Sequence, residues 1–439
     1  MKMKTKLIFT AALFCVTLCV PLSLFSQTQD FQMNGTVLVK YNGNEADVTI
    51  PAGVTAIGDR AFDHCIGPLA VTMQEGVTSI GENAFASCGS LVSITIPSSV
   101  KTIGAGAFHF CRSLTKINIP EGVAVIGRNT FYMCNNLTSV TIPKSVTSIE
   151  KGAFDGCTSL ASIAIPDGVT SIESWVFSIC RNLTNINIPE GVTYIGEYAF
   201  NGCGKLTSIT IPKNVTSIGN DAFRECGSLT SVIIPEGITS IESSVFYGCS
   251  SLVSITIPKS VTSIGNYAFA MCGRLANITI PENVTSIGNS VFSRCASLTS
   301  VTIPQGVTSI GEHLFNYCYG LTSVTIPEGV TSIGDYAFRG CGKLIKVNIP
   351  EGVTYIGEYA FSECPSLTNV TIPANVTTIG RWAFSECTSL TSITIPPSVA
   401  FIGYSAFRYC NKLRTVIVSR RTTLDWFAFP DTARVTYSD

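Results

Sequence analysis

The chain of 439 residues is rich in apolar residues and poor in charge: 46% are hydrophobic, 13% are charged, and the formal net charge is −1 at pH 7. This near-neutral balance gives no basic field for the phosphates of DNA or RNA, so we expect no nucleic-acid partner. The length would allow two or three ordinary domains, but the repeat described below indicates one elongated domain.

The first 26 residues differ from the rest of the chain. Three lysines within the first six residues give a basic start, and residues 7–20 form an apolar run that ends at Pro21. This run is shorter than a bilayer-spanning helix requires, so it predicts a secretory signal peptide over residues 1–26 and a secreted or cell-surface protein. A lipid anchor on Cys19 is the alternative, which the bulky Leu18 before it disfavours. No later segment predicts a membrane span.

The segment 27–45 precedes the first repeat. Within it, residues 31–44 alternate apolar and polar side chains before an Asn42-Gly43 pair, which is typical of a strand or hairpin. The ends of a repeat stack need atypical units that cover the core. We therefore expect residues 27–45 to form an N-terminal cap.

Cysteine then recurs every 23 residues without a slip from Cys65 to Cys410, and phenylalanine keeps the same register three residues before each cysteine. A fixed period of this length indicates one structural unit that is copied many times and stacked. We predict a repeat solenoid over residues 46–418. A stack of this kind offers a long surface and rarely a deep pocket, which favours binding over catalysis.

Each coil begins with the pattern of a strand. In the coil that starts at Cys203, Ile209 and Ile211 alternate with Thr210, so the isoleucines should point inward and the threonine outward. Pro212 follows and should end the strand, because proline has no N–H to donate to a ladder. The predicted core residues of this part of the stack are Phe200, Cys203, Leu206, Ile209, Ile211, Phe223 and Cys226.

The second half of the coil has a different spacing. Ile218, Ala222, Phe223 and Cys226 are separated as residues on one face of a short helix. Because the chain always returns in the same direction, strands of successive coils should be parallel, with right-handed connections. We therefore predict an α/β repeat solenoid: a right-handed stack with one long parallel sheet and short helices on the opposite side.

Residues 419–439 lose the 23-residue period. They carry five large apolar side chains that could cover the last core layer, Leu424, Trp426, Phe427, Phe429 and Tyr437. We expect this segment to form a C-terminal cap.

The run L-x-x-I-x-I-P-x-x-V-x-x-I-G-x-x-A-F-x-x-C, which recurs over residues 46–418, resembles the BspA-type leucine-rich repeat family. The resemblance implies a leucine-rich-repeat solenoid on a secreted or surface-exposed protein. Several members of that family are linked to adhesion to host matrix proteins or to other cells. No ligand follows from the resemblance, because the matching residues are structural. The chain lacks the regular turn asparagine of commoner leucine-rich repeats, so we expect no asparagine ladder.

The sequence offers no set of residues suited to catalysis or metal binding. The three histidines, His64, His109 and His313, stand on different coils. The repeat cysteines would form a straight ladder, which cannot place four ligands around one zinc ion, and their parallel Cβ vectors do not suit disulfides. We expect buried free thiols, no cofactor and no enzymatic activity.

Two exposed surfaces are candidates for binding. The outward strand positions should form a file along the sheet whose candidate residues are Thr141, Asn187, Thr210, Thr256, Thr279, Thr302, Thr325, Asn348 and Thr371. Threonine simply suits an exposed strand, and a hydroxyl face for a glycan is the functional alternative. Aromatic residues occupy variable positions in the second half of many coils: Tyr132, Trp175, Tyr198, Tyr247, Tyr267, Tyr317, Tyr336, Tyr359, Trp382, Tyr404 and Tyr409. They either shield neighbouring coils or form an interface or sugar platform.

The sequence as a whole predicts a secreted, non-enzymatic leucine-rich-repeat protein that binds macromolecules. An adhesin for an extracellular protein, either of the host matrix or of a cell surface, is favoured. A glycan-binding module and a structural surface-layer component are the alternatives.

Overall fold

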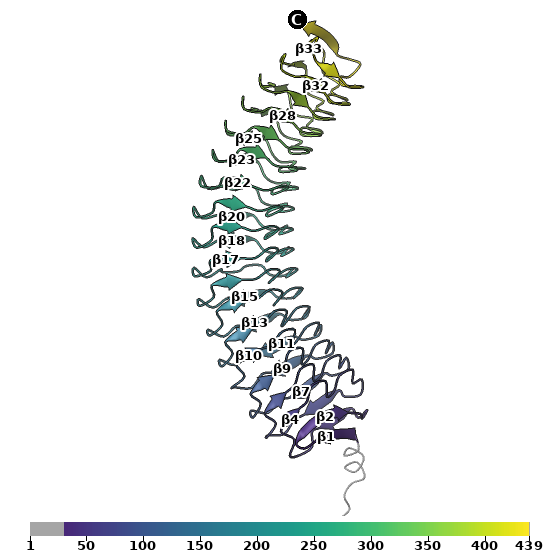
Figure 1. Ribbon diagram of the computed structural model, residues 1–439, viewed down its shortest axis with the longest axis vertical. Helices are drawn as coiled ribbons and strands as arrows, with labels where there is room; N and C mark the ends of the chain where they lie inside the picture. The colour runs from purple at the N-terminus through teal and green to yellow at the C-terminus, as the bar shows by residue number, and fades with distance from the viewer. Residues whose placement is uncertain (1–29, 439) are drawn as a thin grey trace, which may run out of the picture.

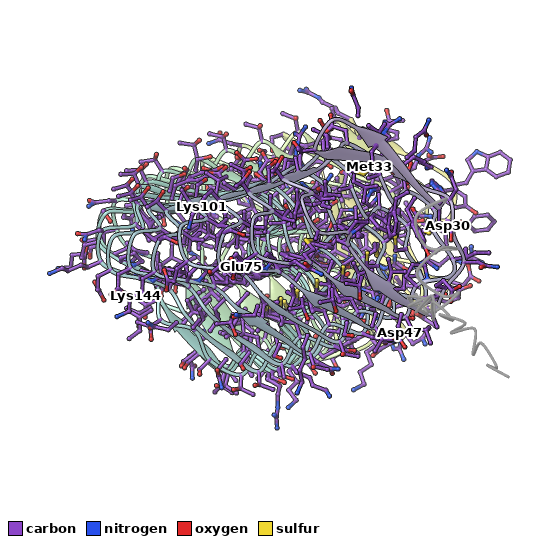
Figure 2. The ribbon with its side chains drawn as sticks, turned by 90° about the horizontal axis from the view of Figure 1, so that it is seen from below. Asp30, Met33, Asp47, Glu75, Lys101 and Lys144 are labelled. Carbon is purple, nitrogen blue, oxygen red and sulfur yellow. The ribbon has the colours of Figure 1, made fainter. Side chains whose placement is uncertain are left out.

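The computed structural model describes residues 30–438, which wind into a long, bowed stack of coils (Figure 1). The proposed signal peptide and residues 27–29 of the proposed N-terminal cap lie outside the described residues. Most coils contribute short strands to two files that run along the stack, and between the strands the chain forms turns. Figure 2 views the stack from the end that carries the N-terminal cap, with Asp30, Met33 and Asp47 at its periphery.

The first file contains the predicted strands in all but two of the coils. Its members are β3 (Asp47–Thr49), β5 (Ala70–Thr72), β7 (Ser93–Thr95), β9 (Lys116–Asn118), β11 (Ser139–Thr141), β13 (Ser162–Ala164), β15 (Asn185–Asn187), β18 (Ser231–Ile233), β20 (Ser254–Thr256), β23 (Ser300–Thr302), β25 (Ser323–Thr325), β27 (Lys346–Val347), β29 (Asn369–Val370), β31 (Ser392–Thr394) and β33 (Thr415–Ser419). Residues 209–211, where the sequence predicted a strand, and the equivalent residues 278–280 form none, and in the second of these coils a single bridge joins Asn277 to Ser300. Where neighbours pair, they do so in parallel and in register with the 23-residue repeat, as Val48 pairs with Val71 and Val71 pairs with Ile94.

The second file lies nine residues further along each coil. It begins with β2 (Val37–Tyr41) and continues through β4 (Ala56–Ile57), β6 (Ser79–Ile80), β8 (Thr102–Ile103), β10 (Val125–Ile126), β12 (Ser148–Ile149), β14 (Ser171–Ile172), β16 (Tyr194–Ile195), β17 (Ser217–Ile218), β19 (Ser240–Ile241), β21 (Ser263–Ile264), β22 (Ser286–Ile287), β24 (Ser309–Ile310), β26 (Ser332–Ile333), β28 (Tyr355–Ile356), β30 (Thr378–Ile379), β32 (Phe401–Ile402) and β34 (Thr423–Leu424). The stacked parallel strands predicted from the sequence are confirmed, but they form two files broken into short sheets rather than one long sheet.

The predicted short helices are wrong, because residues 31–438 contain no helix. Two positions of each coil, 18 and 22 residues after its cysteine, have positive φ angles; in one coil these are Asp221 (φ 56°) and Glu225 (φ 57°). A left-handed residue every fourth position prevents a continuous right-handed helix. Phe223 N–H instead donates to Val245 O of the next coil at 2.9 Å, while Cys226 N–H closes a turn on Phe223 O at 3.2 Å. The chain thus forms successive turns that are hydrogen-bonded from coil to coil.

A column of phenylalanine rings fills the centre of the stack. From Phe62 to Phe407 each ring is fully buried and stacks on the next, with centroids 4.7–5.9 Å apart. The remaining predicted core residues are buried beside it: Phe200, Cys203, Leu206, Ile209, Ile211, Phe223 and Cys226. One continuous core therefore runs through all the coils.

Both ends of the ring column are covered. At the first end a hairpin of β1 (Phe31–Asn34) and β2 places Tyr41 on Phe62, with ring centroids 4.9 Å apart. At the other end, β35 (Arg434–Ser438) pairs with β33, and Phe429 stacks on Phe407 at 5.2 Å. The expectation that all five apolar residues of segment 419–439 cover the core is wrong for three, since they remain largely exposed: Trp426, Phe427 and Tyr437.

The cysteine ladder has a role that the sequence did not reveal. All sixteen cysteines of the described chain are unpaired, and all but the half-buried Cys65 are buried. Each buried thiol donates to the carbonyl of a phenylalanine in the coil before, as Cys226 Sγ does to Phe200 O at 3.2 Å. Burial also raises the pKa of the Cys226 thiol well above its ordinary value. These thiols therefore act as small buried donors rather than as nucleophiles.

A thiol titration tests this arrangement. The denatured, unreduced chain that lacks residues 1–26 should react with a thiol reagent close to sixteen times. The folded chain should react slowly, because burial disfavours the reactive thiolate. A titration near zero after denaturation would mean that the ladder is oxidised.

A glycine follows most strands of the second file, at a position where the backbone of the preceding coil comes close. A Cβ on Gly219 would lie 2.6 Å from Glu197 N and 2.9 Å from Gly196 C, both backbone atoms of the preceding coil. Three coils accommodate a side chain at this position, Glu150, Glu173 and Glu242. Gly219→Ala should therefore strain the stack without unfolding it.

We expect Gly219→Ala to lower the free energy of unfolding by about 1–3 kcal/mol, the usual cost of overpacking. Gly227→Ala is the matched control, because a Cβ there would meet only Ser250 Oγ at 3.6 Å. Guanidinium denaturation of both variants gives the comparison. Equal losses from the two substitutions would contradict close contact at Gly219.

Candidate binding surfaces

The candidate residues of the first strand file are all exposed along one surface of the stack: Thr141, Asn187, Thr210, Thr256, Thr279, Thr302, Thr325, Asn348 and Thr371. Parallel pairing aligns several with their neighbours, as Thr302 is aligned with Thr325. Ala164 and Ile233 interrupt the hydroxyl-bearing residues, at positions aligned with Asn187 and Thr256. The structure thus brings these side chains into one polar file, which we call the threonine file.

Other threonines serve the stack itself. Thr138 Oγ1 donates to Thr115 O at 3.0 Å, and Thr377 Oγ1 donates to Thr354 O at 3.1 Å, in each case the same position of the preceding coil. These hydroxyls replace water with a carbonyl acceptor and link coils outside the strand ladder. The sequence shows threonine at all these positions, and only the structure separates the hydroxyls that bind carbonyls from those of the threonine file.

Shallow depressions lie beside the threonine file. One, of about 290 Å³, is lined by Asn369, Thr371, Thr394 and Pro396 with their strand neighbours. Another, of about 390 Å³, is lined by Thr279, Lys259, Glu282 and Asn283 among others. Neither has an aromatic wall, so this face suits broad contact with a macromolecule better than enclosure of a small ligand.

The second candidate surface is a ladder of rings on the turns. His313, Tyr336, Tyr359 and Trp382 occupy the same position in four successive coils. Their centroids are 4.5, 4.8 and 6.0 Å apart, and each pair is within 7° of parallel. The Arg339 guanidinium lies 5.7 and 5.6 Å from the Tyr336 and Tyr359 ring centroids. Because the rings stack on one another, they largely shield the turns, as the plainer interpretation of the sequence proposed.

Sequence reasoning missed several members of this surface. His313 was considered only as a possible ligand or base, yet it starts the ladder, and Phe427 ends it against Tyr404 at 6.1 Å. Arg408 was not considered, and its guanidinium lies 5.6 Å from the Trp382 ring centroid. The fixed period was the available signal, since His313 stands 23 residues before Tyr336.

The structure does not bring the three histidines together. His64 Nδ1 lies 2.7 Å from Asp63 Oδ1 of the neighbouring residue. Burial is the main cause that lowers the pKa of both His109 and His313, and the charge of His64 adds to the effect on the pKa of His109. Within residues 30–438, no group of three or more His, Cys, Asp or Glu side chains could hold a metal ion. Nowhere in this part of the chain is there a helix with the length and apolarity that crossing a membrane would need.

Stacked parallel strands, a phenylalanine and cysteine core, and long exposed files define a leucine-rich-repeat solenoid. The family described as "BspA type Leucine rich repeat region (6 copies)" matches residues 40–160, 124–252, 216–344 and 308–436. The chain belongs to this BspA-type leucine-rich repeat family.

Solved structures of bacterial proteins are similar to this chain. A leucine-rich repeat protein from Bacteroides ovatus is 32% identical with a TM-score of 0.66, and the match covers 93% of this chain and 97% of that one. A leucine-rich cell surface protein from Faecalibacterium prausnitzii is 33% identical with a TM-score of 0.49, over 77% of this chain and 96% of that one. No curated protein matches the chain.

Proposed function

We propose that this protein is a secreted or cell-surface, non-enzymatic scaffold that binds an extracellular protein through the threonine file, and that the binding mediates adhesion to host matrix or to another cell. The single observation that carries the proposal is the threonine file, a row of exposed and mostly polar side chains that are aligned from coil to coil where neighbouring strands pair. The basic and apolar start of the sequence supports export.

The dimensions of the threonine file favour a protein partner. Coils repeat about every 4.8 Å, so a partner about 30 Å wide would contact roughly six of them. A standard interface removes about 800 Å² from each partner. Binding energy of that size must come from several coils together, and a stack that shares one rigid core presents them without a large ordering cost.

Protein and glycan arrays test the proposal. The chain without residues 1–26 should bind at least one extracellular matrix protein saturably, and free sugars should not compete. The quadruple variant in which Thr256, Thr279, Thr302 and Thr325 are replaced by arginine should lose at least about tenfold in affinity, because four bulky charges would be buried unpaired.

The matched control changes exposed residues elsewhere on the coils, Glu190→Gln, Lys213→Gln and Glu236→Gln, and should bind as the unchanged chain does. Binding to sugars alone would overturn the proposal. Absence of binding on both arrays would also overturn the proposal, and it would favour the alternative that the protein is a structural component of a surface layer.

A further inference from the structure

The ring ladder changes direction at Tyr404. Tyr336 and Tyr359 stack within 7° of parallel, but the Tyr404 ring is turned by 66° relative to Trp382 and by 88° relative to Phe427. Neither neighbour is parallel to Tyr404, and both make edge-type contacts with it. The cause is visible in the sequence, because Tyr404 stands one position earlier in its coil than Trp382 does in the preceding coil. The Tyr404 ring is thus turned out of the parallel ladder.

A groove of about 470 Å³ opens at this place. Its walls include the rings of Tyr359, Trp382 and Tyr404, together with the charged side chains of Glu358, Arg381 and Asp425. Arg381 Nε lies 3.9 Å from Glu358 Oε1, and both side chains are well exposed, at 63% and 42%. The groove therefore combines aromatic rings with donors and acceptors that water can reach.

The charges in the groove select against charged ligands. An anion would meet the carboxylates of Glu358 and Asp425. A cation would meet the guanidinium of Arg381 in the wall of the groove, and those of Arg408 and Arg339, which lie 5.6 Å from the ring centroids of Trp382 and Tyr359. A neutral ring with apolar C–H faces and several hydroxyls fits better, since each hydroxyl both donates and accepts.

We propose that this groove binds a neutral saccharide. The sugar ring stacks on the Tyr404 face, and its hydroxyls donate to Glu358 and accept from Arg381. This site is separate from the threonine file and does not depend on the function proposed for it. The depressions beside the threonine file lack aromatic walls, so they offer no equivalent platform.

The chain supplies a matched control for the rings. Trp175 and Tyr198 hold the ladder position of two earlier coils and stack with centroids 4.1 Å apart and a 17° angle. The same position of the next coil is Asp221, which pairs with Arg224 at 3.1 Å. Trp175 and Tyr198 thus stack face to face, and neither ring is turned across the other. Tyr198→Ala therefore removes a similar ring without touching the groove.

The test uses the full chain without residues 1–26 and four neutral polysaccharides, namely mannan, laminarin, xylan and galactan. Alginate serves as an anionic comparison and chitosan as a cationic one. We expect at least one neutral polysaccharide to retard the protein in affinity electrophoresis. Tyr404→Ala should weaken that binding about tenfold, the loss expected for one aromatic platform. Tyr198→Ala should leave it unchanged.

Trp382 provides a second signal within the same groove. Its fluorescence should change on binding, and Trp382→Phe should remove that change. Circular dichroism checks that each variant keeps its fold. Binding by none of the neutral polysaccharides, binding by alginate or chitosan alone, or unaltered binding by Tyr404→Ala would each overturn the proposal. Capture on matrix-protein arrays should be the same with and without Tyr404→Ala, so failure here is distinct from failure of the threonine file.

Discussion

Phe223→Ala is expected to lower the free energy of unfolding by about 3–5 kcal/mol. The Phe223 ring is fully buried and stacks between Phe200 and Phe246, with centroids at 5.3 and 5.6 Å and angles of 2° and 4°. Truncation removes its buried area and leaves a cavity that both neighbours line. These neighbours are held by their own coils, so the cavity cannot close by a simple shift.

Guanidinium denaturation measures this loss, and Ile233→Thr provides the control. Ile233 is 72% exposed in the threonine file, so its replacement should change stability by less than about 0.5 kcal/mol. A stack can unfold in more than one step, because each coil contacts only its neighbours. The comparison therefore concerns the transition that includes the coil of Phe223. A loss below about 1 kcal/mol would mean that the ring column is not packed.

The sequence predicted the parts of this fold that are set by the repeat itself. The strict spacing of Phe and Cys requires equivalent surroundings in every coil, which a stack with one core provides. The alternation of Ile209 and Ile211 with Thr210 correctly predicted which side chains are buried. The second strand file was harder to foresee, since all of its strands after β2 have two residues, too few for an alternating pattern.

The helix prediction failed because spacing alone does not determine the backbone. Two successive turns place Ile218, Ala222 and Phe223 on one side, as a helix would, while left-handed residues interrupt the helical path. Glycine would have signalled these positions, and it does occur at Gly152, Gly156 and Gly202. In other coils the same positions hold tyrosine, tryptophan or serine. A comparison of all the repeats therefore shows no regular glycine that would mark the left-handed backbone.

The candidate surfaces could be foreseen to different degrees. Exposure of the threonine file follows from strand alternation, because its residues lie opposite a buried neighbour. The saccharide groove depends on how the ring of Tyr404 is oriented, and a side-chain orientation is not written in the spacing. The sequence does show that Tyr404 is one position out of register with Tyr359 and Trp382. The departure from the repeat at Tyr404 is therefore the sequence signal for this groove.

Asp155→Asn is expected to stabilise the protein at neutral pH. The Asp155 side chain lies in the turns of its coil and is only 9% exposed, and its Oδ1 is buried without a hydrogen-bond partner, as is Ser178 Oγ. Burial raises the pKa of Asp155 to about 6 from an ordinary value of 3.8. The folded protein thus prefers the protonated carboxyl.

The sign of the pH dependence follows from these two pKa values. Below about pH 4 the carboxyl is protonated in both states and costs no ionisation energy. As pH rises from about 4 to 6, the unfolded chain releases its proton first, so stability falls. A pKa difference of about two units corresponds to about 3 kcal/mol, and this penalty is complete above pH 6. Asp155→Asn removes the ionisation, so its gain should reach at most about 3 kcal/mol at pH 7.

Guanidinium denaturation at pH 4 and pH 7 distinguishes this result from a general gain in packing. The difference between Asp155→Asn and the unchanged chain should grow with pH, and Asp155→Ser should behave similarly, because Ser178 already occupies the equivalent position of the next coil. Asp221→Asn is the control: the Asp221 carboxylate pairs with Arg224 at 3.1 Å, so its loss should not stabilise the protein at either pH. An equal gain at both pH values would show that ionisation of Asp155 is not the cause, because only the charged carboxylate carries the penalty.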